Sequence, residues 1–213
     1  MMKKLFFTMV FVAAAFFCNA QLFVGGNIGL GTTANKVTMG SETNEGPKSF
    51  TFYFNPSVGY MFNDNIGAGI VLGFSTTTVK EKELNEELKG TLNSFSVSPY
   101  FRYVFANFGD IDLYADAMFT YSYAKTKGTA ANTTVDINKT NTWGVSVVPG
   151  ISYSLTDNIL FYSNLNLLQL GYQSIKETEF GDVTDLDVET IDNNFYFGVN
   201  NNSPITLGII YVF

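Results

Sequence analysis

One alternating pattern of apolar and polar positions recurs along this chain. In three copies a proline is followed four residues later by tyrosine, and two residues after that by phenylalanine or leucine. All these positions share one side of an extended chain, because successive side chains of a strand point to opposite faces. The copies occupy residues 52–62, 95–105 and 145–155, and residues 207–213 repeat the frame with leucine in place of proline. Alternation of this kind predicts β-strands.

Continued along the chain, the alternation predicts eight strands. Their expected ranges are 22–31, 49–62, 66–74, 92–105, 111–124, 142–155, 159–172 and a last strand that ends at residue 213. Short turns follow the second, fourth and sixth strands, at 63–65, 106–110 and 156–158, and polar loops are expected at 33–48, 80–90, 125–140 and 173–193. Short turns at one end and long loops at the other are typical of outer-membrane barrels.

The two faces of the predicted strands differ in composition. One face carries Phe, Tyr, Ile, Leu, Val and Ala, and the other carries Gly, Ser, Thr and Asn with few charges. A water-facing exterior would hold more Lys and Glu, so the small polar face is expected to line a narrow lumen and the apolar face to meet lipid. Aromatic residues near both strand ends fit the two membrane interfaces. A soluble β-sandwich with aromatic-rich strands is the alternative.

The sequence therefore predicts an all-β fold, an eight-stranded antiparallel up-and-down transmembrane β-barrel with short periplasmic turns and longer extracellular loops. A closed sheet suits the hydrocarbon core of a membrane because it has no edge strand whose backbone N–H and C=O groups would remain unpaired there.

The first twenty residues are expected to be a signal peptide rather than part of the fold. A cationic start with Lys3 and Lys4 precedes an uncharged apolar run, and small residues end at Ala20. This arrangement predicts cleavage after Ala20 and a barrel domain over residues 21–213. A lipoprotein signal with Cys18 as the lipidated residue is the alternative, but the bulky Phe16 and Phe17 before it disfavour that reading.

Composition removes several classes of function. The chain has no histidine, and its single cysteine lies in the predicted signal peptide, so histidine-based triads and the usual zinc sites are excluded. Without Lys3 and Lys4, 10 basic residues face 19 acidic ones, a net charge of −9 that disfavours nucleic acid as a partner. The sequence predicts no catalytic, cofactor or metal site, and a protein that is not an enzyme.

One charged residue on the predicted polar face stands out. Arg102 lies on the fourth strand, and pairing Phe105 with Ile111 would place it opposite Tyr114, with Asp112 and Asp116 diagonal to it. Arg102, Asp112 and Asp116 are therefore candidates for a lumen ion pair. They either plug the lumen or form a selectivity or proton-path element. An eight-stranded barrel encloses little more than its own side chains, so no open pore is expected.

Two further features carry expectations. The acidic segment Asp185-x-Asp187-x-Glu189 could recruit calcium through oxygen ligands, but it lacks the full calcium-loop signature, so a solvated surface loop is the favoured interpretation. The three prolines of the repeated frame should coincide with bulges or missing ladder bonds, because proline donates no backbone hydrogen bond; they are Pro56, Pro99 and Pro149.

The chain also resembles a known family, on two stretches. Residues 56–60, Pro-Ser-Val-Gly-Tyr, and the terminal residues 208–213 are similar to the small eight-stranded outer-membrane barrels of the OmpA/OmpX type, especially the porin-like branch with a Pro…Gly-Tyr motif. The resemblance covers about residues 21–213. It implies that Tyr211 and Phe213 form the signal recognised by the barrel-assembly machinery.

We therefore expect a non-enzymatic barrel in the outer membrane of a Gram-negative bacterium, in contact with outer-membrane lipid. Its expected role is envelope-structural or surface-interaction, with loops exposed outside and their ligand unidentified. A narrow porin-like channel for small solutes or ions is the alternative. A lipid-modifying enzyme is disfavoured by the absence of histidine.

Overall fold

A computed structural model describes residues 21–39, 42–83, 86–130, 133–165, 168–180, 188–199 and 206–213. The predicted signal peptide, residues 1–20, lies outside these ranges, so its cleavage stays a prediction. Across these ranges no helix has the length and apolarity needed to cross a membrane.

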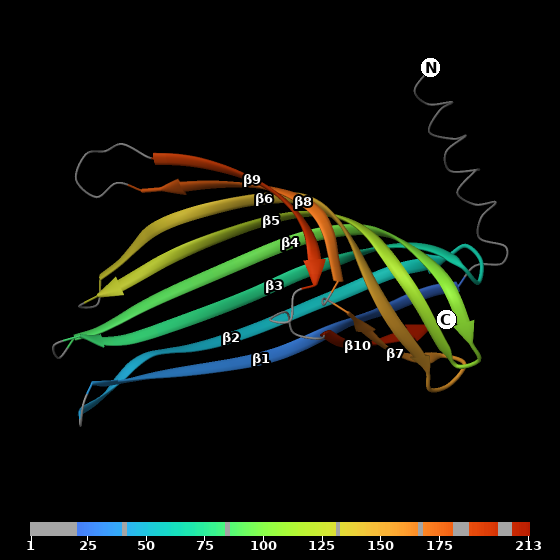
Figure 1. The fold of residues 1–213 in the computed structure, drawn as a ribbon, viewed down its shortest axis with the longest axis horizontal. Helices are drawn as coiled ribbons and strands as arrows, with labels where there is room; N and C mark the ends of the chain where they lie inside the picture. The colour runs from blue at the N-terminus through green and yellow to red at the C-terminus, as the bar shows by residue number, and fades with distance from the viewer. Residues whose placement is uncertain are drawn as a thin grey trace, which may run out of the picture.

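Within the described residues, ten strands make up one antiparallel sheet. They are β1 (Gln21–Met39), β2 (Glu42–Met61), β3 (Ile66–Glu83), β4 (Glu86–Phe108), β5 (Ile111–Ala130), β6 (Thr133–Ser154), β7 (Ile159–Asn164), β8 (Leu168–Glu179), β9 (Val188–Val199) and β10 (Thr206–Val212). The strands β1 to β6 run side by side in chain order (Figure 1).

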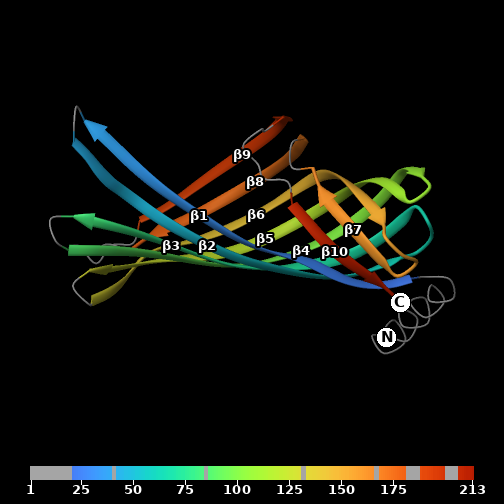
Figure 2. The same cartoon turned by 90° about the horizontal axis from the view of Figure 1, so that it is seen from below.

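The sheet closes into a ring of eight strand positions. The strand β6 pairs with β7 near the short turns and with β8 further along, while β10 pairs with both β7 and β1. The seventh predicted strand is thus divided into β7 and β8, and the eighth into β9 and β10. The short strands β7 and β10 lie at the end of the molecule that carries the C-terminus (Figure 2). The predicted eight-stranded antiparallel barrel is confirmed.

The strands are longer than the sequence predicts. Residues expected in loops at 33–48, 80–90 and 125–140 are strand wherever the structure describes them, and β1 to β6 reach 18 to 23 residues each. Their Thr-rich sequences suit a pleated sheet, and ladder bonds satisfy the backbone as well outside the membrane as within it. The connections at this end are therefore long hairpins rather than irregular loops.

The three prolines interrupt the ladder, as the sequence predicts. Between β2 and β3 the pairing skips Asn55 and Pro56, and between β4 and β5 it skips Ser98 and Pro99. Pro149 lies where β6 exchanges β8 for β7. On its other side each proline stays in register, opposite Gly26, Ile70 and Ala115 respectively. Because proline lacks an N–H group, only one side of each strand loses its bonds.

Rings and glycines fill the interior of the barrel in matched pairs. Five aromatic side chains on the inner face each lie directly opposite a glycine of the neighbouring strand, and a methyl group on that glycine would overlap the ring. The pairs are Phe23 with Gly59, Tyr53 with Gly29, Tyr100 with Gly69, Tyr114 with Gly150 and Tyr162 with Gly208. The glycines of the polar face therefore seat the rings that fill the narrow lumen.

The outer face has the dimensions of a membrane-spanning band. On β6 the exposed aromatic residues Trp143 and Tyr153 lie ten residues apart, or about 33 Å along a strand. A tilt of about 40° reduces this to about 25 Å, the height of the apolar band of outer-membrane barrels. The strands continue beyond Trp143, so their extra length projects on the side of the long hairpins.

Candidate functional site

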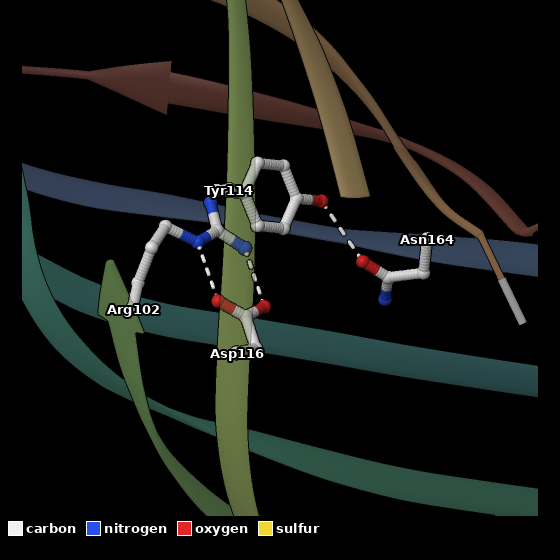
Figure 3. Close-up of polar contacts among 4 residues, drawn as sticks. All are labelled: Arg102, Tyr114, Asp116 and Asn164. Atoms are coloured by element: carbon white, nitrogen blue, oxygen red, sulfur yellow. Dashed lines mark hydrogen bonds and ion pairs between the residues drawn. The ribbon is translucent and has the colours of Figure 1, made fainter. Parts of the chain in front are cut away.

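A buried ion pair joins the neighbouring strands β4 and β5 on the inner face of the barrel (Figure 3). The Arg102 guanidinium donates two hydrogen bonds to the Asp116 carboxylate, from Nε to Oδ1 and from Nη2 to Oδ2, both 2.8 Å long. The two side chains are only 10% and 5% exposed. Such a bidentate pair fixes the guanidinium in one plane.

The register that brings these residues together differs from the predicted one. The sequence predicts Phe105 opposite Ile111 and Arg102 opposite Tyr114, whereas the structure pairs Phe108 with Ile111 and Arg102 directly with Asp116. The predicted register is therefore wrong, for two reasons. Gly109 adopts a positive φ of 73° and allows a tight two-residue turn. A one-residue irregularity between Val104 and Ala106 then shifts the pairing above it.

The two candidate carboxylates have different partners. Asp116 binds Arg102, while Asp112 accepts a hydrogen bond of 2.6 Å from the Asn107 side-chain amide, which lies directly opposite on β4. Asp112 thus belongs to the turn end of the barrel, away from the guanidinium.

Two tyrosines enclose the guanidinium. The Arg102 Cζ atom lies 3.8 Å from the centroid of the Tyr114 ring and 5.5 Å from that of Tyr100. Both distances are within the range of cation–π attraction. The fully buried Tyr114 hydroxyl donates a 2.8 Å hydrogen bond to the Asn164 side-chain oxygen at the end of β7 (Figure 3). The ion pair is thereby tied to three strands.

A second polar group lies across the interior and was not anticipated from sequence. The Asn55 amide donates to the Asn27 side-chain oxygen over 2.8 Å, and the Asn27 amide donates to the Tyr162 hydroxyl over 3.2 Å. Asn27 and Tyr162 are 135 residues apart in the chain, so no local pattern could join them. Tyr100 could have been found, because it lies two residues before Arg102 on the same face.

The ion pair separates two cavities inside the barrel. One, of about 320 Å³, opens toward the short turns, and Asn107, Asp112 and Tyr114 are among its lining residues. The other, of about 160 Å³, lies toward the hairpins and is lined by Asn27, Asn55, Asp116 and other residues. Arg102 lines both. The residues around it therefore form a partition across the lumen.

The C-terminal aromatic residues lie on the outside of the barrel. Tyr211 and Phe213 are 44% and 66% exposed, and their rings meet edge to face with centroids 5.0 Å apart. The Phe213 N–H donates to the Leu22 carbonyl over 2.9 Å, which ties the end of the chain to β1. Tyr60 and Phe62 repeat the same edge-to-face contact at 5.4 Å.

The chemistry of the interior is that of a fixed, neutral ion pair. In the part of the chain that the structure describes, no three acidic, histidine or cysteine side chains gather to hold a metal ion. Asp185 and Asp187 of the calcium hypothesis lie outside the described residues, and Glu189 is ion-paired with Lys176 at 2.9 Å. Breaking a buried pair by removing one partner costs about 3–5 kcal/mol, so the partition is a stable part of the fold.

The fold and its interior can be compared with known proteins. The crystal structure of the outer membrane protein OprG from Pseudomonas aeruginosa matches with a TM-score of 0.53 and 15% sequence identity, over 91% of this chain and 96% of that one. Neisserial surface protein A matches with 17% identity over 92% and 99% of the two chains, at a TM-score of 0.40. At 15% identity the likeness to OprG shows the fold alone. No curated protein sequence matches this chain.

The sequence itself also matches a family model. The model is described as an outer membrane protein beta-barrel domain, and it matches residues 5–202. This match agrees with the closed antiparallel ring of strands and with the aromatic residues on its outer face, since all three indicate an outer-membrane barrel. The chain belongs to the outer membrane protein β-barrel domain family and resides in the outer membrane of a Gram-negative bacterium.

Proposed function

We propose that this protein is a non-enzymatic, non-conducting barrel with an envelope-structural or surface-interaction role, which carries long hairpins beyond the outer membrane. The observation that carries the proposal is the partition made by Arg102, Asp116 and the two tyrosines between the interior cavities. An ion passing this layer would have to lose its water shell beside a guanidinium whose charge Asp116 already neutralises.

The surface role is supported by strand length. At about 3.3 Å per residue, the 23 residues of β4 extend over about 76 Å, or about 58 Å when tilted by 40°. The apolar band needs about 25 Å of this. More than half of such a strand therefore stands clear of the hydrocarbon, on a rigid ladder suited to presenting a binding surface.

A narrow channel for small solutes or ions is the second candidate. It is favoured by the fact that the two cavities share the lining residues Arg102 and Ile210, so that little more than these side chains lies between them. The non-conducting barrel and the narrow channel differ in the conductance expected of the wild-type protein. Only a channel passes ionic current while the Arg102–Asp116 ion pair is in place.

Planar-bilayer recordings test the choice. The wild-type barrel should give no stable conductance steps, while Arg102→Ala should give small steps, because it removes one of the two side chains, Arg102 and Ile210, that line both cavities. Asp112→Ala is the matched control, since it removes a lumen carboxylate outside the ion pair and should stay silent. Large, stable steps from the wild type would establish the channel instead.

Recognition by the barrel-assembly machinery is part of the same proposal. Tyr211 and Phe213 lie exposed on the outer face of the last strand, where a folding factor could reach them. Replacing both by alanine should lower the amount of folded, heat-modifiable protein in the outer membrane, whereas the matched Tyr60→Ala/Phe62→Ala pair should lower it less. Equal losses in the two variants would indicate a packing role alone.

A further inference from the structure

The cavity on the turn side of the barrel has an acidic lining near its mouth. Each of the three short turns, or the strand that leaves it, contributes one aspartate: Asp64, Asp112 and Asp157. None of the three forms an ion pair with another described residue. The one cation among the described lining residues, Arg102, is already bound by Asp116. The turn side of this cavity therefore carries three negative charges that no protein cation balances.

A buried hydroxyl group faces the same cavity. Ser152 is only 6% exposed and is one of the lining residues. The registers place it directly between Asp112 of β5 and Tyr162 of β7. Both neighbours bond elsewhere, since Asp112 accepts a hydrogen bond from Asn107 and the Tyr162 hydroxyl accepts one from Asn27.

Within the described part of the chain, the Ser152 hydroxyl has no hydrogen-bond partner. Buried polar side chains normally have one. An unpartnered hydroxyl beside the Asp112 carboxylate thus marks a position at which a ligand atom can donate to both oxygens.

Apolar side chains form the wall beside this hydroxyl. Phe23, Ile210 and Val212 belong to the buried apolar cluster of the barrel, Leu160 packs against it, and all four line the cavity. The cavity volume of about 320 Å³ lies at the lower end of the range for small-molecule sites, which are mostly apolar with a few placed polar groups. The lining therefore suits a small ligand with an apolar middle and cationic ends.

The arrangement of the carboxylates distinguishes an organic cation from a metal ion. Among the described residues, no three acidic side chains gather closely enough to hold a metal. The three aspartates come from two different turns and from β5, so one ligand reaches more than one of them only if its charges are separated. Ammonium groups form strong, charge-assisted hydrogen bonds with carboxylates, and a diamine carries two of them on an apolar chain.

We propose that the turn-side cavity binds a linear alkyl diamine from the periplasm. One ammonium group donates hydrogen bonds to the Asp112 carboxylate and to the Ser152 hydroxyl oxygen. The methylene chain lies against Phe23 and Ile210, and the second ammonium group lies at the mouth near Asp157.

The Arg102 partition closes the inner end of this site, so the ligand enters and leaves from the turn side. The proposal goes beyond the non-conducting role and does not depend on it, because equilibrium binding is measured without a membrane current. Failure of one proposal is therefore distinguishable from failure of the other.

The test titrates the barrel, refolded in zwitterionic detergent micelles, with putrescine, and measures binding by isothermal titration calorimetry. Putrescine should bind saturably with one molecule per barrel. Butylamine, which has the same chain and one ammonium group, should bind up to about fivefold more weakly, because an ion pair at an exposed mouth contributes little. The corresponding uncharged diol should show no binding.

Two variants address the inner ammonium group. Asp112→Asn keeps the size of the side chain and removes its charge, and it should weaken putrescine binding about tenfold or more, because hydrogen bonds to charged groups are the strong ones. Ser152→Val removes the accepting oxygen and should weaken binding about fivefold. Asp110→Asn is the matched control, since this aspartate precedes β5 in the same turn but does not line the cavity; it should change binding less than twofold.

Heat-modifiable gel mobility establishes that each variant is folded. Absence of saturable putrescine binding to the wild type would overturn the proposal, as would diol binding as tight as that of the diamine. Unchanged affinity in both Asp112→Asn and Ser152→Val would also overturn it. An equal loss in Asp110→Asn would show that the acidic turn end attracts cations without a defined site.

Discussion

The two halves of this barrel solve different physical problems. In the turn half, aromatic rings lie against glycines, β10 pairs with β1 and so closes the barrel, and a buried ion pair lies on the inner face. In the hairpin half, long strands carry lysines such as Lys80 and Lys89 on the outer face, and Gly90 of β4 has open space around it. The comparison teaches that the stability of the half within hydrocarbon depends on interior packing, whereas that of the half outside depends chiefly on the hydrogen bonds between its strands.

The largest effect on stability is expected from the ion pair. Arg102→Ala leaves the Asp116 carboxylate buried without its guanidinium and removes the cation between two tyrosines, so the free energy of unfolding should fall by about 3–5 kcal/mol. Urea unfolding in lipid vesicles, followed by heat-modifiable mobility, measures it. The double variant Arg102→Leu/Asp116→Leu should recover most of the loss, because no charge is left unpaired. A double variant as unstable as the single one would show that packing, not charge, dominates.

A moderate effect is expected where a glycine seats a ring. In Gly150→Ala the new methyl group overlaps the Tyr114 ring and displaces it from Arg102, which should cost about 1–3 kcal/mol. The matched control lies in the other half: Gly90→Ala on β4 meets no atom within 4 Å and should be neutral or slightly stabilising. Equal destabilisation of the two variants in urea unfolding would remove the contrast between the halves.

The smallest effect is expected from a surface ion pair of the hairpin half. Lys125 binds Asp136 at 2.6 Å, but both side chains are substantially exposed, and water screens such pairs. Lys125→Gln should therefore leave the unfolding midpoint in lipid-free detergent unchanged within error. A loss comparable to that of Gly150→Ala would mean that the hairpin half contributes to global stability after all.

Much of the fold could be predicted from the sequence because its signals are local. Period-two alternation placed the strands and their faces, the Asn-Asp-Asn and Thr-Asp-Asn triplets placed two of the short turns, and the prolines marked the interrupted ladders. The ends of the strands were less predictable. Polar stretches such as 125–140 look like loops in the sequence, yet their several threonines and the alternating Val135 and Ile137 suit strands, and they continue as hairpins. The division of the last two strands around Pro149 depends on a partner exchange that the sequence does not reveal.

The site was predictable only in part. Arg102 and Asp116 could be placed on one face, but their direct pairing depends on the Gly109 turn and on the irregularity next to Val104. The Asn55–Asn27–Tyr162 chain joins β1, β2 and β7 and has no local signature.

The repeated Pro–Tyr–Phe frame and the alternation around it determined, by sequence alone, that the chain forms a membrane-spanning sheet with a lipid face and a small polar face. Tertiary structure decided which inner residues meet, because register between strands depends on turn geometry and bulges, and a shift of one residue exchanges every neighbour. It also decided that Lys48, Lys80 and Lys89 of three different strands lie side by side on the outer face. That arrangement exists only once the strands are aligned side by side.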